Sequence, residues 1–281
     1  METSSFFQSS FISRFDADFD DRVYDINVLS IPIITISSGS MSNYSIGKQK
    51  GRIFQIFNIN HEFEKGFEIT ILNDKNNTLW MSDTPQERMM MYANAKHAKG
   101  KTLVGGLGLG IYLQYAQKGK AGNAVQFIIV EKSKEVIDLI EPVLKRSLNV
   151  PYQIINDSIE NYLENTKDKF DEIFIDTWDT LEPRKLPMIN GIKKKAFLHL
   201  SWGGIIHLWG YKWIIDMYKN ACIELVRMDK DKMEWVIESL ERIDEKSAKL
   251  LAEIESKYHG YIEKNMEEIE KEIIEIGKRI S

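Results

Sequence analysis

The sequence predicts an α/β fold, a Rossmann-like doubly wound and mostly parallel sheet with helices on both faces. Three observations support this prediction. Beyond about residue 101, short continuous apolar runs alternate with helix-like stretches, which is typical of strands buried on both faces. A glycine-rich turn, Gly105–Gly110, follows the first of these runs. The 281 residues are also sufficient to bury a large core without disulfides.

Four regions follow one another along the chain. Residues 1–51 form a Ser-rich N-terminal segment that we expect to be partly disordered, although Asn27–Ile36 is strand-like. Residues 52–85 form a small β-rich region, and residues 86–228 form the Rossmann-like domain. Residues 229–281 form a charged helical tail with a coiled-coil pattern.

The β-rich region contains three short runs of β-forming residues, namely Ile53–Asn58, Phe67–Leu72 and Thr78–Met81. The turn-forming cluster Asn73–Asn77 separates the last two, which predicts a hairpin. A helix is then expected to run to about Ala98. Thr84 is its predicted N-cap, Pro85 its first residue, and Glu87 can reach back to the cap.

The Rossmann-like domain alternates strands and helices. The predicted strands are Thr102–Val104, Val125–Val130, Tyr152–Ile155, Ile173–Ile175 and Gly204–Leu208. The predicted helices between them cover about 111–119, Ser133–Leu148, Ser158–Asn165 and Leu186–Leu200. Pro142 is expected to break or kink the second helix.

The helical tail carries the whole charge imbalance. The chain has 37 basic and 42 acidic residues, a net charge of −5, and the tail alone holds 15 acidic and 10 basic residues. Its apolar residues follow a heptad seam, namely Ile262, Met266, Ile269, Ile273, Ile276 and Ile280. The seam predicts a helix contact, either within the chain or between copies in a homo-oligomer. His259-Gly260 is expected to interrupt the helix before it.

Composition excludes several classes of protein. The single cysteine, Cys222, rules out an internal disulfide framework, and the five histidines show no metal-ligand spacing, so we predict no metal. The apolar run Val28–Ile36 is far too short to span a membrane, and no basic leader precedes it. With a net charge of −5, general nucleic-acid binding is not expected. We therefore expect a cytoplasmic protein that acts on a small molecule.

Chemistry-bearing residues follow the predicted strands. In a parallel sheet, ligands bind beyond the carboxyl ends of the strands. The first strand ends at the glycine turn, and the second at Glu131, whose carboxylate can accept both hydroxyls of a ribose. The third strand ends at Asn156-Asp157. The fourth ends at Asp176, with Asp179 and Glu182 close behind, which favours a cationic acceptor.

This ordered series resembles the class I S-adenosylmethionine-dependent methyltransferase superfamily, and most of all its spermidine synthase-like branch. The branch opens its glycine motif with an apolar residue, here Val104, and carries a D-x-x-D sequence after strand four, here Asp176 and Asp179. It also has a small N-terminal β-domain ahead of a helix bearing a Glu, which resembles residues 52–87. The resemblance covers roughly residues 52–210.

The resemblance implies a cofactor, S-adenosylmethionine or its decarboxylated form. The residues that it assigns to the cofactor are Gly105, Gly106, Leu107, Gly108, Gly110, Glu131, Lys132, Asp157, Ser158 and Asp176. Glu131 would hold the ribose hydroxyls, and Asp157 the adenine amino group with Ile159 against the ring. Asp176 and Asp179 would be catalytic, and Trp178, Glu182 and Glu87 would bind the substrate.

Two departures from the branch favour a methyltransferase over an aminopropyltransferase. Thr180 follows the second acid where the aminopropyltransferase signature has Pro, and Gly108 replaces an acid that helps to recognise the donor's amine. In addition, a helix rather than an antiparallel hairpin follows Gly204–Leu208. Three hypotheses remain: a methyltransferase for a small or cationic amine, an aminopropyltransferase, and a catalytically silent nucleotide-binding module that assembles through its tail.

Ordinary structural roles remain open for the same residues. The glycine turn also fits a plain strand-to-helix junction or a dinucleotide site. A dinucleotide site prefers G-x-G-x-x-G/A, and the third position falls on Ile111, which counts against it. Asp157 fits an N-cap in a capping box with Glu160, and Glu87 fits a capping residue. Asp179 and Glu182 fit solvated loop acids.

Overall fold

The computed structural model describes residues 19–228, 230–241, 245–258 and 266–280. The chain divides into two compact units. The first unit comprises the chain up to Asp179 together with Ile192–Gly210, and the second comprises Thr180–Gly191 and the chain from Tyr211 onward. The predicted disorder of the first 18 residues falls outside the described residues, as does the predicted interruption at His259-Gly260.

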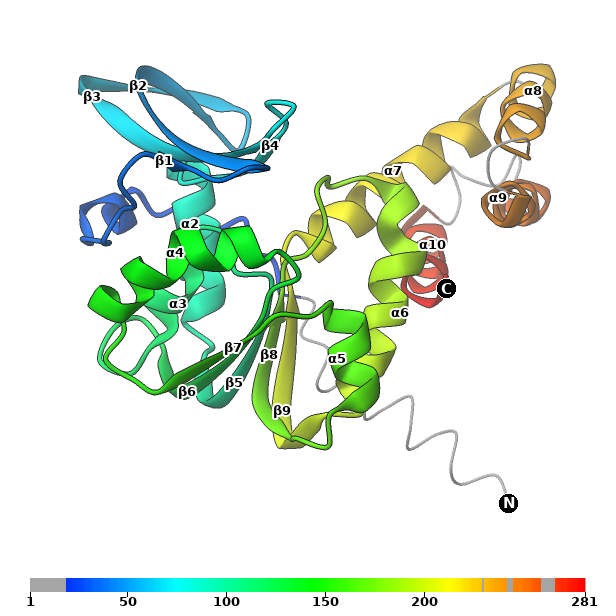
Figure 1. The fold of residues 1–281 in the computed structure, drawn as a ribbon. Coiled ribbons are helices and arrows are strands. Elements are labelled where there is room, and N and C mark those ends of the chain that lie inside the picture. Colours follow the sequence, from blue (N-terminus) through cyan, green and yellow to red (C-terminus); the bar gives the residue numbers. More distant parts are fainter. Residues whose placement is uncertain (1–18, 229, 242–244, 259–265, 281) are drawn as a thin grey trace. The chain divides into compact units, whose positions relative to one another are not determined.

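A five-stranded parallel sheet forms the centre of the first unit (Figure 1). Its strands are β5 (Lys99–Gly105), β6 (Asn123–Val130), β7 (Tyr152–Ile155), β8 (Phe170–Ile175) and β9 (Leu200–Leu208). Their order is β7-β6-β5-β8-β9, and every neighbouring pair is parallel. The strand order reverses at β5, so the fold is the predicted Rossmann-like, doubly wound sheet.

Helices connect the strands and cover both faces of the sheet. They are α3 (Ile111–Ala116), α4 (Lys134–Ser147), α5 (Ile159–Asn165) and α6 (Leu186–Phe197). Right-handed crossovers place α3 and α4 on one face and α5 on the other, as Figure 1 shows. Pro142 lies inside α4, which the structure assigns as one uninterrupted helix, so the helix is not broken there and the kink stays a prediction.

Apolar side chains of the strands form the core between these layers. Val104, Phe127 and Ile129 are fully buried and belong to one cluster. On the same face, the ring of Tyr112 from α3 stacks on Phe174 of β8 with 3.9 Å between the centroids. Burying apolar surface of this kind is the main favourable term in folding, because it removes that surface from water.

An antiparallel sheet of four strands precedes the parallel one. The strands are β1 (Gly39–Ser40), β2 (Tyr44–Ile56), β3 (Ile59–Asp74) and β4 (Leu79–Ser82), in that order. The hairpin predicted around Asn73–Asn77 is confirmed, because β3 pairs with β4. The sheet begins earlier than the expected boundary at residue 52, and β2 and β3 are far longer than the predicted runs.

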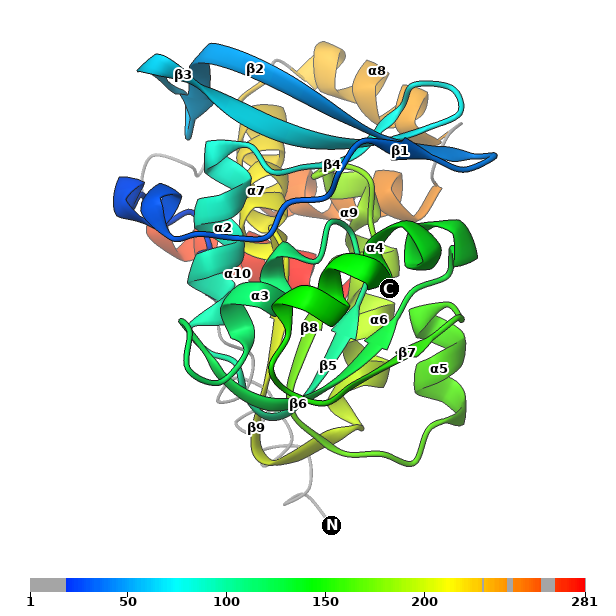
Figure 2. The same ribbon diagram turned by 60° about the vertical axis from the view of Figure 1, so that its left-hand side comes forward.

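The strand expected within Asn27–Ile36 is wrong. Residues Ile26–Ser30 form a 3-10 helix, η1, because the Asp25 side chain accepts a hydrogen bond from the Asn27 backbone N–H and caps this turn. The segment that follows lies against the Rossmann-like core. Ile34 exchanges two hydrogen bonds with the Gln114 amide, and Asn43 donates two to the Glu135 carboxylate. Figure 2 shows this segment passing α2 before it enters β1.

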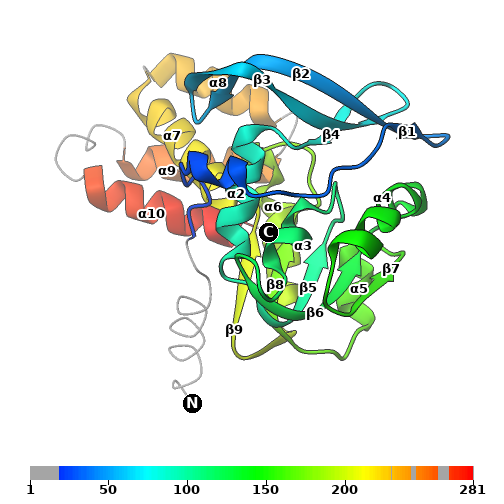
Figure 3. The same cartoon turned by 90° about the vertical axis from the view of Figure 1, so that its left-hand side faces the viewer.

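Helix α2 (Pro85–Ala95) joins the two sheets and begins as predicted. The Thr84 hydroxyl accepts a hydrogen bond from the Glu87 backbone N–H at 3.3 Å, and Pro85 is the first helical residue. A buried ion pair of 2.8 Å joins Arg88 to Asp83, whose carboxylate also accepts the Thr70 backbone N–H. These contacts fix the antiparallel sheet to α2, which lies beneath it in Figure 3.

The second unit is helical. It contains η2 (Pro183–Lys185), α7 (Tyr211–Arg227), α8 (Lys230–Glu241), α9 (Glu245–Tyr258) and α10 (Met266–Arg279). The seam residues Ile269 and Ile273 of α10 are buried, and α10 packs against α7 of the same chain. No helix among the residues that the structure describes is long and apolar enough to cross a membrane.

Candidate functional site

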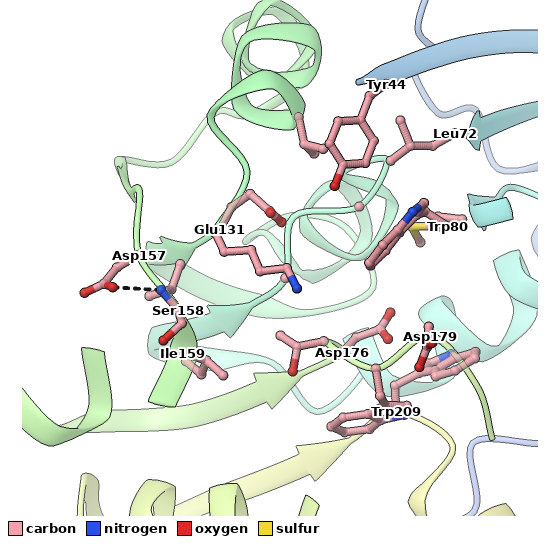
Figure 4. Close-up of a pocket in the computed structure, with 18 of the residues that line it drawn as sticks. Tyr44, Leu72, Trp80, Glu131, Asp157, Ser158, Ile159, Asp176, Asp179 and Trp209 are labelled. Atoms are coloured by element: carbon pink, nitrogen blue, oxygen red, sulfur yellow. Dashed lines mark hydrogen bonds between the residues drawn. The ribbon is translucent and has the colours of Figure 1, made fainter. Parts of the chain in front are cut away.

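A pocket of about 280 Å³ opens at the carboxyl ends of the parallel strands (Figure 4). All the residues that line it belong to the first unit. They are Tyr44, Leu72, Leu79, Trp80, Met81, Glu87, Gly106, Gly108, Val130, Glu131, Lys132, Val136, Asp157, Ser158, Ile159, Glu160, Asp176, Thr177, Trp178, Asp179 and Trp209. The pocket therefore lies where the strand order reverses, which is where open α/β sheets bind ligands.

The glycine turn after β5 brings bare backbone to this pocket. Gly106, Gly108 and Gly110 all have positive φ values, of 90°, 49° and 70°. A Cβ atom on Gly106 would lie 2.1 Å from the carbonyl oxygen of Asp176, so β5 and β8 approach too closely there for a side chain. Glycine is required at this point because both the conformation and the space exclude other residues.

Met81 of β4 lies against the same turn. Its sulfur accepts a hydrogen bond from the Leu109 backbone N–H at 3.1 Å. A Cβ atom on Gly108 would be 2.1 Å from that sulfur. The antiparallel sheet therefore reaches the glycine turn directly, and the room beside Gly108 is set by a flexible side chain.

Glu131 is held at the end of β6 by two backbone donors. The Leu107 N–H donates to one carboxylate oxygen at 3.0 Å, and the Ser133 N–H donates to the other at 2.8 Å. Each oxygen has a further lone pair, so the carboxylate can still accept two hydrogen bonds from a ligand. Figure 4 shows Glu131 on one side of the pocket and Asp176 across from it.

Asp157 follows β7 at the outer edge of the pocket, with its carboxylate turned away from Asp176 in Figure 4. Its two oxygens accept the Ser158 backbone N–H at 2.8 Å and the Asn161 side-chain amide at 2.6 Å. The N-cap of α5 is Ser158, whose hydroxyl accepts the Asn161 backbone N–H, so the expectation that Asp157 is the cap is wrong. Ile159 beside it is buried and adds an apolar surface to the pocket.

Asp176 follows β8 and lies on the pocket floor. Its backbone N–H donates to the Gly105 carbonyl at 2.8 Å, which fixes the residue to the end of β5. Burial and, to a smaller extent, the charge of the Asp21 carboxylate together raise the pKa of its carboxyl to about 7. Asp176 thus exchanges its proton close to neutral pH, which suits a general base.

Glu87, in the first turn of α2, also lines the pocket. Burial raises the pKa of its carboxyl well above the usual range, with Asp176 and Asp21 as further causes. The structure therefore brings Glu87 of α2 to the same cavity as Asp176, which follows β8.

Of the remaining residues predicted to act on or bind the substrate, two line the pocket and one does not. Asp179 and Trp178 line the pocket, and Trp178 is only 6% exposed, with an indole N–H that has no partner among the described residues. Glu182 belongs to the second unit, where it pairs with Arg184. Three predicted cofactor residues, Gly105, Leu107 and Gly110, do not line the pocket but belong to the strand end and turn that shape it.

Several lining residues were not predicted from the sequence. Tyr44, Leu72 and Trp80 come from the antiparallel sheet, and the Trp80 ring lies edge-on to Tyr44 at 6.2 Å. The predicted residue Lys132 places its ammonium 5.5 Å from the centroid of the Trp80 ring. Trp80 in the run Thr78–Met81 was the available sign of an aromatic lining residue. The sequence of this run does not show which end of the antiparallel sheet faces the pocket.

Asp21 is the other residue that the sequence analysis missed. It is 2% exposed, and its carboxylate accepts the Gly210 backbone N–H at 2.9 Å and the Asn94 amide at 3.2 Å. It lies in a Ser-rich, acidic stretch, and nothing in that pattern distinguishes it from the neighbouring aspartates. Among the described residues, no group of three or more His, Cys, Asp or Glu side chains is arranged to hold a metal ion.

Comparisons with known proteins find likeness in solved structures alone, since no family model and no curated protein matches the chain. The Thermotoga maritima spermidine synthase aligns over 66% of this chain and 62% of its own, with 16% identity and a TM-score of 0.40. Trm5b of Pyrococcus abyssi aligns over 57% and 47%, with 16% identity and a TM-score of 0.34. Arabidopsis thaliana protein arginine methyltransferase 10 aligns over 68% and 51%, with 18% identity and a TM-score of 0.32.

These neighbours are class I S-adenosylmethionine-dependent methyltransferase-fold proteins. The chain spans between 47% and 62% of the length of these three proteins. At this level of similarity the likeness concerns the fold.

Proposed function

We propose that this protein is an S-adenosylmethionine-dependent transferase, a methyltransferase that acts on a small or cationic amine. One observation carries the proposal. The glycine turn, Glu131 and Asp176, which come from the ends of three parallel strands, border the same pocket. Glu131, which we assign to the donor, and Asp176, which we assign to the acceptor, therefore lie on opposite sides of one cavity.

The residues on the donor side fit an adenosine-bearing ligand. Glu131 offers two acceptor oxygens that backbone N–H groups orient, which matches a pair of ribose hydroxyls. Val130, Val136 and Ile159 supply apolar surface for a ring. Gly106 lines the pocket with bare backbone, against which a ligand can lie. When bound, S-adenosylmethionine would supply an activated methyl group.

The residues on the acceptor side fit an amine. An attacking amine has to lose a proton before or during the transfer, and a carboxylate with a pKa near 7 can take it. Glu87 and Asp179 add negative charge to the same pocket, and Trp178 adds an aromatic surface. The contribution of the chain's own residues is therefore to orient the amine nitrogen and to hold its proton on Asp176.

Aminopropyl transfer from decarboxylated S-adenosylmethionine is the second candidate. The observation that favours it is the reach of the antiparallel sheet, since Tyr44, Trp80 and Met81 all line the pocket. Gly108, which stands where the spermidine synthase-like branch has an acid, argues for the unmodified donor. Calorimetric titration with the two donors separates the candidates, and tighter binding of the decarboxylated form would favour aminopropyl transfer.

Thermal unfolding with S-adenosylmethionine or S-adenosylhomocysteine tests donor binding. We expect either ligand to raise Tm, because a ligand that binds only the folded state stabilises it by mass action. Glu131→Ala is expected to remove most of this shift, whereas Glu141→Ala, at a partly exposed position on α4 that does not line the pocket, is expected to keep it. The proposal fails if neither ligand raises Tm in the wild-type protein.

A further inference from the structure

Asp21 is a buried carboxylate from the segment that precedes the antiparallel sheet. One of its oxygens, Oδ2, accepts the Gly210 backbone N–H at 2.9 Å and the Asn94 side-chain amide at 3.2 Å. The other, Oδ1, is buried and has no hydrogen-bond partner among the described residues. An unpaired buried carboxylate oxygen is costly, so its retention calls for a physical reason.

Backbone contacts connect Asp21 to the pocket floor. Gly210 directly follows Trp209, which lines the pocket and donates its backbone N–H to the Ile175 carbonyl at 3.0 Å. Ile175 in turn precedes Asp176. Asp21 therefore holds the end of β9 at the point where β9 meets the end of β8.

Helix α2 provides a second connection. Asn94 lies seven residues after Glu87, so the two side chains share one face of the helix. Asn94 contacts Asp21, and Glu87 lines the pocket. Asp21 accordingly raises the pKa of both Glu87 and Asp176, while burial raises its own pKa to about 6.

The three carboxylates form no ion pair within the described part of the chain, although the neighbouring Arg22 lowers the pKa of Asp21 by its charge. No lysine or arginine there forms an ion pair with Asp21, Glu87 or Asp176. The nearest buried cation on α2, Arg88, pairs instead with Asp83. Ionised together, the three carboxylates would repel one another strongly in a poorly hydrated interior, and each has a raised pKa. A cation bound in the pocket would relieve that repulsion.

We propose that Asp21, Glu87 and Asp176 together select a ligand with an ammonium group, and that Asp21 determines this specificity from outside the pocket wall. The inference rests on the proposed function. It extends that function by naming the three carboxylates that recognise the positive charge of the acceptor, of which Asp21 does not touch the ligand. Glu87 and Asp176 contact the ammonium, and Asp21 adds its charge behind them.

Other charged groups face the same region. Glu131, Lys132, Asp157 and Glu160 line the donor side of the pocket, and Asp179 lines the acceptor side. Lys132 lies against Trp80. Arg22, next to Asp21, lowers the pKa of the Asp21 carboxyl, and Asp20 raises it. These groups remain unchanged in the variants below, so their contribution cancels in the comparison.

An NMR titration of the full chain, saturated with S-adenosylhomocysteine, tests the inference with two probes of equal length. 1,4-Diaminobutane carries two ammonium groups, and 1,4-butanediol carries none. We expect Asp21→Asn to weaken binding of the diamine about tenfold, because one charge near the ammonium is removed. Binding of the diol should not change. Asp25→Asn, in the same segment but at the cap of η1, should leave both unchanged.

A purely structural role for Asp21 would weaken both probes alike, and that result would overturn the inference. Unchanged diamine binding in Asp21→Asn would also overturn it. If this variant does not fold, Glu87→Gln provides the test, with the same selective loss of the diamine expected. Failure of S-adenosylhomocysteine to bind would contradict the proposed function instead, and diamine selectivity measured without it would still decide the role of Asp21.

Discussion

Gly106 and Gly108 share a left-handed backbone but differ in what surrounds them. A side chain at Gly106 would meet the backbone carbonyl of Asp176, which cannot move without shifting the end of β8. A side chain at Gly108 would meet the sulfur of Met81, which is the flexible end of a long side chain. A side chain is therefore excluded by rigid backbone at Gly106, but only by a movable side chain at Gly108.

This difference predicts unequal costs for two alanine substitutions. We expect Gly108→Ala to cost about 1–2 kcal/mol, close to the intrinsic penalty of a left-handed non-glycine residue. Gly106→Ala is expected to cost clearly more and to weaken donor binding, because it displaces Asp176. Urea unfolding of both variants measures the difference, and equal costs would contradict the assigned contacts.

Among the helices, α10 shows most clearly what a sequence pattern leaves open. The heptad seam fits either a contact within the chain or a contact between copies. In the structure, Ile273 is 0% exposed, and a Cβ atom on Gly277 would lie 2.8 Å from the ring of Tyr218 in α7. The Asn190 amide also donates to the carbonyls of Gly277 and Ile280, at 2.9 and 2.7 Å. The seam therefore packs on its own unit, and the expected homo-oligomer stays a prediction.

Packing of this kind predicts a graded response along the seam. Ile273→Ala is expected to lower the free energy of unfolding of the second unit by about 2–5 kcal/mol, because it leaves a cavity in a buried site. Ile276→Ala, at a partly exposed seam position, is expected to cost less. Urea unfolding followed by circular dichroism measures both variants. A larger loss from Ile276→Ala would show that the exposed side of α10 is covered by another copy.

Across the whole molecule, buried acids link stability to pH. Glu172 of β8 is 0% exposed, and burial raises the pKa of its carboxyl to about 8. It faces Tyr112 and Thr102, and its Oε1 lies 3.6 Å from Nδ1 of His207. Burial lowers the pKa of His207 to about 3, so the imidazole stays neutral across the physiological range. Glu172 therefore holds its proton in the folded state at neutral pH.

The sign of the pH effect follows from these shifts. An acid whose pKa is raised by folding binds its proton more tightly in the native state, so stability falls as pH rises through the shifted value. His207 has the opposite effect, but that effect ends above its unfolded pKa of 6.5. Between pH 6.5 and 8 stability falls through Asp176 and Glu172, with raised pKa values of about 7 and 8, and through Glu87, whose pKa burial raises well above its usual range.

We therefore expect the wild-type protein to lose stability between pH 6.5 and 8, with about 1–2 kcal/mol of the loss due to Glu172. Glu172→Gln mimics the protonated acid and should remove this part. Chemical unfolding of both proteins at several pH values measures the slopes. Parallel slopes for the two proteins would show that Glu172 does not carry the effect.

The parallel sheet was predictable because each of its strands is buried on both faces. Such strands read as continuous apolar runs, as in Val125–Val130, and the chemistry at their ends follows from one geometric rule. The long strands β2 and β3 were not predictable in full, since much of their length is exposed and carries no clear pattern of burial. The cap at Thr84 was predictable because it depends on four consecutive residues.

Within the Rossmann-like domain, the sequence by itself determined the order of strands and helices, the glycine turn and the acids at the strand ends. These features depend on neighbouring residues, so local patterns reveal them. Only the tertiary structure decided that Asp21 binds Gly210, that Trp80 and Met81 reach the pocket, and that the α10 seam packs on α7. Each of these contacts joins residues far apart in the chain. Which distant surfaces meet is decided by the packing of the whole core.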